Sequence, residues 1–408
     1  MIDMIECKNE RNLKEGRIME IRLLRNIKLD YISTFITNLN MQSCIWVLYL
    51  TYCNMSLLQI GLLEGIYHIT SMVCEIPSGA WADLVGRKRS MLISRVCITI
   101  SCIIMLFSRN FWGFALSVIL QALGNAFTSG AEEALVYDSL KCIEKEDDFI
   151  KVNGRLNMII EVSQAIATVA GGVLAEYSYV WCYAACVVIA LLSLVPVVFM
   201  TEPPILDETE RLSGMELVKN HFKISYQILK NDTRIMKIIV FYSLVFAAHT
   251  LLFFYSQQYF FDLGYNKIKI SIIFLFAGAV SCLGALASDY LYQRLRDKVA
   301  VLSAVIIAFA MICYGFNIPW LAMTVFVISS FFNAVLYPVE SECLNRLIPS
   351  EQRATLISIN SMFFSVMMIV MFPIAGFLAG IWNLPIVLMG FGCLVLIFSF
   401  QRRINRTS

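Results

Sequence analysis

Carboxylates inside long apolar segments are the residues of this chain best suited to do chemistry. They lie within or at the edge of such segments: Glu64, Glu75, Glu132, Glu133, Glu161, Glu340 and Glu342. An acid at membrane depth usually faces a cavity or a partner, and burial favours its protonated form. We predict that at least one acid carries a proton, with these candidates: Glu132, Glu133, Glu340, Glu161 and Glu64. The alternative is a set of ion pairs at helix ends. Glu75, beside Pro77, fits a structural role better, and Glu161 either pairs with Arg155 or lines a route.

Uncharged polar side chains provide a second set of candidates. In the first apolar segment Asn38, Gln42 and Trp46 are spaced by four, so they share one face of a helix. We expect this face to line a cavity; the alternative is hydrogen bonding between helices. The seventh segment adds three cavity candidates: His249, Tyr255 and Gln258. A histidine there either titrates during function or is a packed, hydrogen-bonded residue.

Other chemistries find no support in the sequence. None of the 13 cysteines form a C-x-x-C pair, and Cys182 and Cys186 share a helical face that favours packing over a disulfide or metal site. The three histidines, His68, His221 and His249, lack metal-ligand spacing. No phosphate-binding GxxxxGK[ST] loop is present, and no Ser-His-Asp order stands out. We therefore expect no metal, no cofactor and no enzymatic activity.

The composition predicts the elements that must position these residues. The chain is 59% hydrophobic and 15% charged, with a mean hydropathy of +0.71, whereas ordinary soluble domains are about 45–50% apolar and 25% charged. A helix needs about 20 apolar residues to cross a bilayer, and every span must be helical. Twelve segments meet this length: 31–53, 58–80, 91–108, 111–135, 156–176, 180–200, 236–261, 268–291, 298–316, 318–343, 355–380 and 383–401. We predict an all-α integral membrane protein with twelve transmembrane helices.

The distribution of Lys and Arg predicts the orientation. When alternate loops are assigned to opposite sides, all but three of the 32 basic residues fall on one side. The exceptions are Arg109, Lys267 and Lys269. By the positive-inside rule, both termini are cytoplasmic and the number of spans is even. We expect a multi-pass protein of the cell (inner, cytoplasmic) membrane, and the net charge of +2 gives no reason to expect a nucleic-acid partner.

The two halves of the chain resemble each other. "NAFTSGAEEAL" at 125–135 aligns with "NAVLYPVESEC" at 333–343, "GGVLA" at 171–175 with "AGFLA" at 375–379, and Asp83 with Asp289. Three similar offsets indicate a parallel duplication of six helices, an arrangement of transporters whose site lies between the halves. We predict an N-terminal tail and six-helix half at 1–200, a central cytoplasmic loop at 201–234 and a C-terminal half at 235–408. Together the halves form two pseudo-symmetric six-helix bundles.

A polar stretch between the second and third segments carries the most specific motif. It reads "PSGAWADLVGRKRS", and its motif residues are Gly79, Asp83, Gly86, Arg87, Lys88 and Arg89. The glycines permit close approach of two helices and a tight turn, and Asp83 lies four residues before Arg87, within reach of an ion pair if the turn is helical. The motif resembles the signature of the major facilitator superfamily. "EIPSGAWADLVGRKRS", "SGAEEALVYDSL" and "IPSEQRATLISI" are similar to bacterial facilitators of the drug-exporter type. In the second half the signature has decayed: Ala285 and Tyr292 replace the glycines, while Asp289 and Arg294 remain.

The resemblance implies a gating role for this motif. In the family, the acid at Asp83 meets the start of the eleventh helix, here near Arg353, and Asp138 joins the network. Such a clasp stabilises the outward-open state and releases on switching. The alternative is a topology anchor with no gating role.

The resemblance also implies a function. We expect a monomeric secondary transporter that exports small amphipathic molecules by alternating access, exchanging them for protons. Its partners are then the substrate, protons and the bilayer. The alternatives are a proton-coupled importer, a dedicated exporter of one metabolite, or a non-transporting sensor on the same scaffold. The export direction comes from the resemblance alone.

Overall fold

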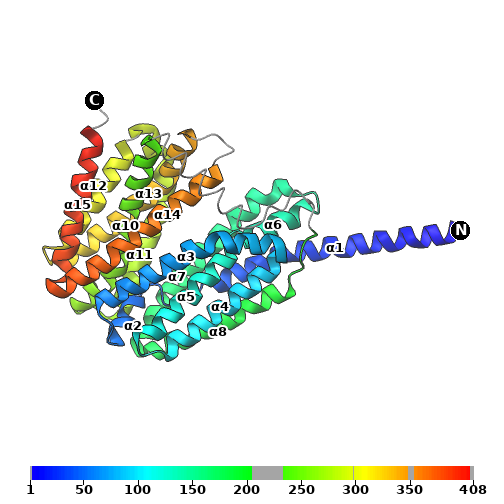
Figure 1. Ribbon diagram of the computed structural model, residues 1–408, viewed down its shortest axis with the longest axis horizontal. Helices are drawn as coiled ribbons and strands as arrows, with labels where there is room; N and C mark the ends of the chain where they lie inside the picture. The colour runs from blue at the N-terminus through cyan, green and yellow to red at the C-terminus, as the bar shows by residue number, and fades with distance from the viewer. Residues whose placement is uncertain (1, 205–232, 297, 348–352, 405–408) are drawn as a thin grey trace.

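The computed structural model describes residues 2–204, 233–296, 298–347 and 353–404, and these residues are almost entirely helical. Two helical bundles lie side by side (Figure 1). The N-terminal bundle contains α1 (Ile2–Thr37), α2 (Trp46–Tyr52), α3 (Leu57–Val85), α4 (Arg87–Phe107), α5 (Phe111–Thr128), α6 (Ala131–Lys141), the 3₁₀ turn η1 (Glu146–Asp148), α7 (Phe149–Tyr177) and α8 (Tyr179–Phe199). The C-terminal bundle contains α10 (Thr233–Asp262), α11 (Lys267–Leu295), α12 (Lys298–Tyr314), α13 (Pro319–Leu347), α14 (Arg353–Ile381) and α15 (Leu384–Ile404).

All twelve predicted segments are occupied by helix. Within the described residues, nine helical segments are long and apolar enough to cross a membrane, and Lys298–Tyr314 and Leu384–Phe400 are apolar but shorter. The first predicted segment is covered by the end of α1 together with α2. The all-α membrane fold is thus confirmed. Most of the predicted central loop, residues 205–232, lies outside the described part of the chain.

Several helices begin at polar caps on the end of the molecule where the bundles meet. The side chains of Ser56, Asn110, Ser178 and Asn266 each accept a backbone N–H in the first turn of α3, α5, α8 and α11. At α3 the Gln59 side chain returns the bond to the Ser56 amide and completes a capping box. These caps satisfy amides that a helix start leaves unpaired.

The prediction of one continuous helix over 31–53 was wrong. α1 ends at Thr37, residues 38–45 form turns, and α2 begins at Trp46. The Asn38 side chain donates to the Thr34 carbonyl at 2.9 Å. Gln257 of α10 accepts from the Val47 amide at 3.0 Å and donates to the Ser43 carbonyl at 2.9 Å. The other bundle therefore supplies backbone partners that an interrupted helix needs.

The fourth predicted segment, 111–135, also contains a break. α5 ends at Thr128, and α6 continues from Ala131 to Lys141. Gly130 between them has φ of +75°, in the left-handed region that glycine adopts without a steric penalty. α6 is therefore a short arm attached to α5 through a glycine.

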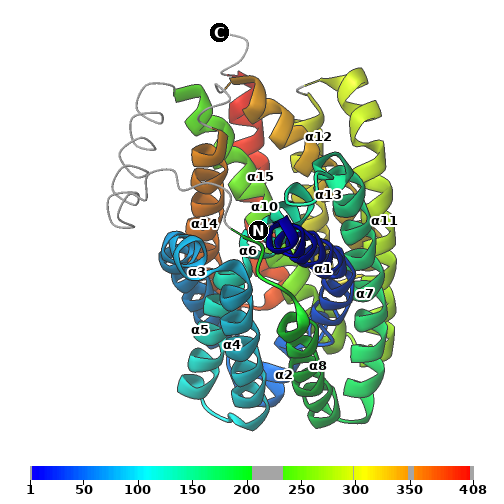
Figure 2. The same cartoon turned by 90° about the vertical axis from the view of Figure 1, so that its right-hand side faces the viewer.

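The bundles contact each other along two antiparallel helix pairs, α3 with α14 and α7 with α11 (Figures 1 and 2). Along the first seam, Gly61 packs against the backbone of Phe372, and His68 Nδ1 lies 3.3 Å from Ser365 Oγ. Along the second, the Lys267 amide donates to the Glu176 carboxylate at 2.8 Å. Toward the other end of the molecule the bundles diverge (Figure 1).

Candidate functional site

A cavity of about 930 Å³ lies between the two bundles. Residues of α4, α5, α7 and α8 line it on one side, and residues of α10, α11 and α13 line it on the other. The turns after α1 complete the wall. Because both bundles contribute, any motion of one bundle against the other changes the shape of this cavity.

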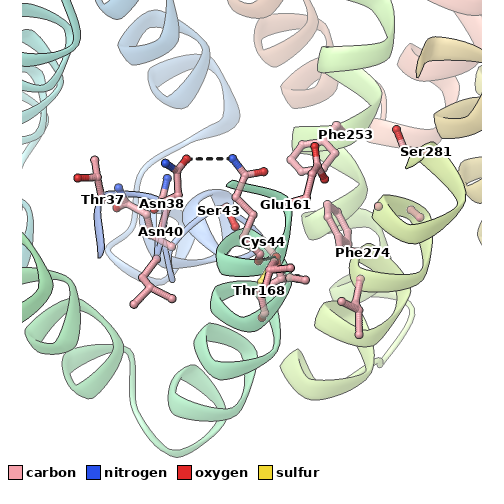
Figure 3. A pocket seen from close by; sticks show the side chains of 18 of the residues that line it. Thr37, Asn38, Asn40, Ser43, Cys44, Glu161, Thr168, Phe253, Phe274 and Ser281 are labelled. Atoms are coloured by element: carbon pink, nitrogen blue, oxygen red, sulfur yellow. Dashed lines mark hydrogen bonds between the residues drawn. The ribbon is translucent and has the colours of Figure 1, made fainter. Parts of the chain in front are cut away.

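The cavity wall is rich in amides and hydroxyls and poor in charge. Its amide side chains are Asn38, Asn40, Gln42, Gln121, Asn125, Gln164 and Asn333. Gln164 donates to Asn38 at 3.3 Å (Figure 3). Glu161 is the one carboxylate among the described lining residues, and those residues include neither Lys nor Arg. Figure 3 shows Glu161 with the aromatic lining residues Phe253 and Phe274. The described wall thus offers hydrogen-bonding groups, aromatic surface and one carboxylate.

The three residues of the first segment that were predicted to share one helical face lie in two different places. Asn38 and Gln42 line the cavity. Trp46 is buried behind the wall, where its ring meets that of Phe254 edge-on at 5.5 Å. The three residues do not share one helical face, because the chain is not helical between α1 and α2.

The three candidates on α10 also divide. His249 lines the cavity, and its buried Nε2 has no hydrogen-bond partner. Tyr255 lies in the seam, where its hydroxyl donates to the Phe372 carbonyl at 3.2 Å. Gln258 accepts from Thr51 of α2 at 3.0 Å and donates to Asp262 at 2.7 Å. Tyr255 and Gln258 thus contribute to packing at the closed end.

The candidate acids are dispersed. Glu161 faces the cavity, where Cys282 of α11 donates to it at 3.5 Å. Glu64 pairs with His68 at 3.5 Å within α3. Glu340 is 6% exposed, and its Oε1 has no hydrogen-bond partner. Glu132 pairs with Arg95 at 3.1 Å, whereas Glu133 is exposed. Among the five, only Glu161 belongs to the cavity wall.

The signature turn between α3 and α4 is held by several contacts. Gly86 has φ of +113°, which favours glycine. Arg87 Nε lies 2.8 Å from Asp138 Oδ2 of α6. Lys88 donates to the Val198 carbonyl at 2.8 Å, and Arg89 is exposed. The side chains of Asp83 and Arg353 lie outside the described part of the structure; Gly79 has no neighbour within 4 Å of an added Cβ.

Glu202, which is not among the residues predicted from the sequence, also holds this turn. The amides of Arg87 and Lys88 donate to its carboxylate at 2.6 and 2.9 Å. A Cβ on Gly86 would lie 3.0–3.1 Å from that carboxylate. The acid therefore caps the start of α4, where amides and the helix dipole favour an anion. Glu202 lies 115 residues after Arg87, so the sequence around the motif does not indicate this contact.

Glu202→Ala should lower the free energy of unfolding by about 1 kcal/mol, the typical value of a helix cap. Thermal unfolding of the purified protein measures this loss. The exposed Glu146 gives the matched control, and Glu146→Ala should leave the midpoint unchanged. Equal midpoints for both variants would contradict the capping role.

A helical membrane protein whose two bundles share a polar cavity has the architecture of a secondary transporter. The family comparison agrees. The model described as the Major Facilitator Superfamily matches residues 31–298 and 282–406, and the chain belongs to that family. It is a membrane transporter of this superfamily.

Individual relatives are distant. The uncharacterized MFS-type transporter YxaM of Bacillus subtilis is 24% identical over 341 residues, covering 78% of this chain and 80% of the relative. The nucleoside transporter NupG has a similar fold, with a TM-score of 0.74, 13% identity, and coverage of 93% of this chain and 97% of NupG. A D-xylose-proton symporter gives a TM-score of 0.69 at 14% identity, covering 94% and 96%. These structures share the fold with this chain.

Proposed function

We propose that this transporter exports small amphipathic molecules across the cytoplasmic membrane in exchange for protons. The observation that carries the proposal is the cavity shared by both bundles, whose described wall has one carboxylate, Glu161, among amides and aromatic rings. A carboxylate in such a place attracts an organic cation, and the rings provide apolar and cation–π contact. The preferred substrate is therefore a monovalent cation with an aromatic or apolar body.

The two seams between the bundles support alternating access. The bundles touch along α3–α14 and α7–α11 at the end where α3 and α11 begin. Rocking about the cavity opens this end and closes the other. By the distribution of Lys and Arg, the divergent end faces the cytoplasm. On that side the Arg87–Asp138 pair and the Glu202 cap hold the turn of the signature motif.

Transport into proteoliposomes tests the proposal. With an imposed pH gradient, a monocationic dye should accumulate, and dissipating the gradient should stop it. Glu161→Gln should reduce dye uptake about 10- to 100-fold, because charge-assisted contacts are worth roughly 1.5–3 kcal/mol. Glu146→Gln, an exposed acid-to-amide change, should transport normally. If neither dyes nor a panel of metabolites moves at any gradient, the transport proposal fails; if uptake is unaffected by Glu161→Gln, the cation site fails.

A further inference from the structure

A charged cluster lies inside the N-terminal bundle, away from the cavity wall. Arg95 of α4 is only 1% exposed. Its Nη2 lies 3.1 Å from Glu132 Oε1 of α6 and 3.4 Å from Ser33 Oγ of α1. Asp30 of α1 is also 1% exposed, and it lies three residues before Ser33, on the same face of that helix.

The charges of this cluster do not balance. One guanidinium faces two carboxyl groups, so full ionisation would bury a net negative charge. No hydrogen-bond donor meets either oxygen of Asp30, and the Glu132 carboxyl lies within hydrogen-bonding reach of it. The neighbouring polar groups on α1 do not supply a positive charge: Ser33 is a hydroxyl, Asn26 bonds Ser139 and Thr201, and the buried Tyr31 hydroxyl has no hydrogen-bond partner. Two like charges that share a buried site cannot both remain ionised, and a proton restores the balance.

We propose that Asp30 and Glu132 share one exchangeable proton beside Arg95, forming a proton site separate from the substrate cavity. Asp30 is closed off from solvent, whereas the Glu132 side chain is 24% exposed. Glu132 is therefore the route by which the proton enters and leaves. When the proton leaves, Arg95 must balance two carboxylates instead of one.

The position of Glu132 connects this site to the cavity. α6 is held to α4 at two points, Arg87–Asp138 at 2.8 Å and Arg95–Glu132 at 3.1 Å. Buried Met91 and Leu135 belong to one apolar cluster that packs at this contact. At its other end α6 joins α5 through Gly130, and α5 carries the cavity residues Gln121 and Asn125. A change in the charge on Glu132 changes the strength of its ion pair with Arg95, and therefore how firmly α6 is held to α4. α6 is joined to α5, which lines the cavity.

Infrared spectroscopy of the purified full-length chain tests the proton site without any substrate. Compared with the wild type, Asp30→Asn and Glu132→Gln should each lose about one protonated carboxyl from the pH-dependent C=O band. Each variant leaves Arg95 paired with one remaining acid, which stays ionised. Glu133→Gln, one residue away and exposed, should keep the full band. Unchanged band intensity in both site variants, or a loss in only one of them, overturns the shared proton. Thermal unfolding confirms that each variant is folded.

A second experiment measures whether this proton site is coupled to substrate transport. This part of the inference rests on the proposed exchange of substrate for protons. In proteoliposomes Asp30→Asn should still exchange substrate at equal concentrations but should no longer accumulate it against a gradient. Normal gradient-driven accumulation would overturn the coupling role. If the wild type moves no substrate at all, the transport proposal fails, while the infrared comparison still decides whether the site holds a proton.

Discussion

Arg95→Gln should lower the free energy of unfolding by about 3–5 kcal/mol, the usual loss when one partner is removed from a buried ion pair. Arg95 is 1% exposed, and its removal takes away the guanidinium that pairs with Glu132 in the cluster that also contains Asp30. Protonation of these acids relieves the repulsion. The loss should therefore be larger at alkaline than at acidic pH. Denaturant or thermal unfolding in detergent at several pH values measures it.

Arg89 provides the matched control for this prediction. It lies on the same helix, six residues earlier, and is exposed. Arg89→Gln should change stability by less than about 0.5 kcal/mol, as for most surface substitutions. If Arg95→Gln unfolds like Arg89→Gln at every pH, the cluster contributes no stabilising charge balance. Adding Asp30→Asn to Arg95→Gln should recover part of the loss, because one of the unpaired carboxyl groups is then removed.

The sequence was sufficient to predict the helices because lipid leaves few alternatives. A segment of about 20 apolar residues must be helical in a bilayer, and so all twelve segments are found. The interruptions were missed for a physical reason. The break after Thr37 depends on Gln257, which lies more than 200 residues away and bonds both Ser43 and Val47. Hydropathy carries no information about such a partner.

Only some of the predicted cavity residues line the cavity, because the sequence does not show whether a polar helical face meets the cavity or another helix. Asn38, Gln42, Glu161 and His249 line the cavity. Gln258 was selected, whereas its neighbour Gln257 makes the buried bonds across the bundles. Adjacent helical residues point about 100° apart, and a single sequence cannot say which direction faces the other bundle.

The distribution of basic residues did not identify Arg95 as part of a buried charged cluster. Arg95 is one of the basic residues assigned to the cytoplasmic side, whose distribution predicts the orientation. Yet it lies two turns inside α4, where a basic side chain requires an acidic partner. The depth of Arg95 within the helix was the available signal. Its partner Glu132 is one of the predicted proton carriers, and the structure places that acid beside Arg95 within the N-terminal bundle.

One glycine lies at a helix contact between the bundles, and another lies at a contact within one bundle. Substituting each of them distinguishes an effect on conformational switching from an effect on stability. Gly61 of α3 faces α14, and an added Cβ would lie 2.5 Å from the Phe372 carbonyl oxygen and 2.9 Å from Pro373 Cα. These atoms belong to different bundles, so separation of the bundles at this end relieves the overlap. Gly61→Ala should shift the protein toward the state open at this end and reduce turnover more than about tenfold. Its unfolding midpoint should remain close to that of the wild type.

Gly284 of α11 is the matched control because it makes the same kind of contact within one bundle. Its added Cβ would overlap the Phe331 carbonyl of α13, and rocking cannot separate two helices of one bundle. Gly284→Ala should therefore lower stability by about 1–3 kcal/mol, as overpacking does. Accessibility of single cysteines introduced at the two ends of the cavity, together with thermal unfolding, measures both effects. Equal loss of stability in the two variants, without a change in accessibility for Gly61→Ala, would contradict the view that the α3–α14 seam opens during transport. The distinction depends only on which bundle each neighbour belongs to, since both substitutions add one methyl group against a helix backbone.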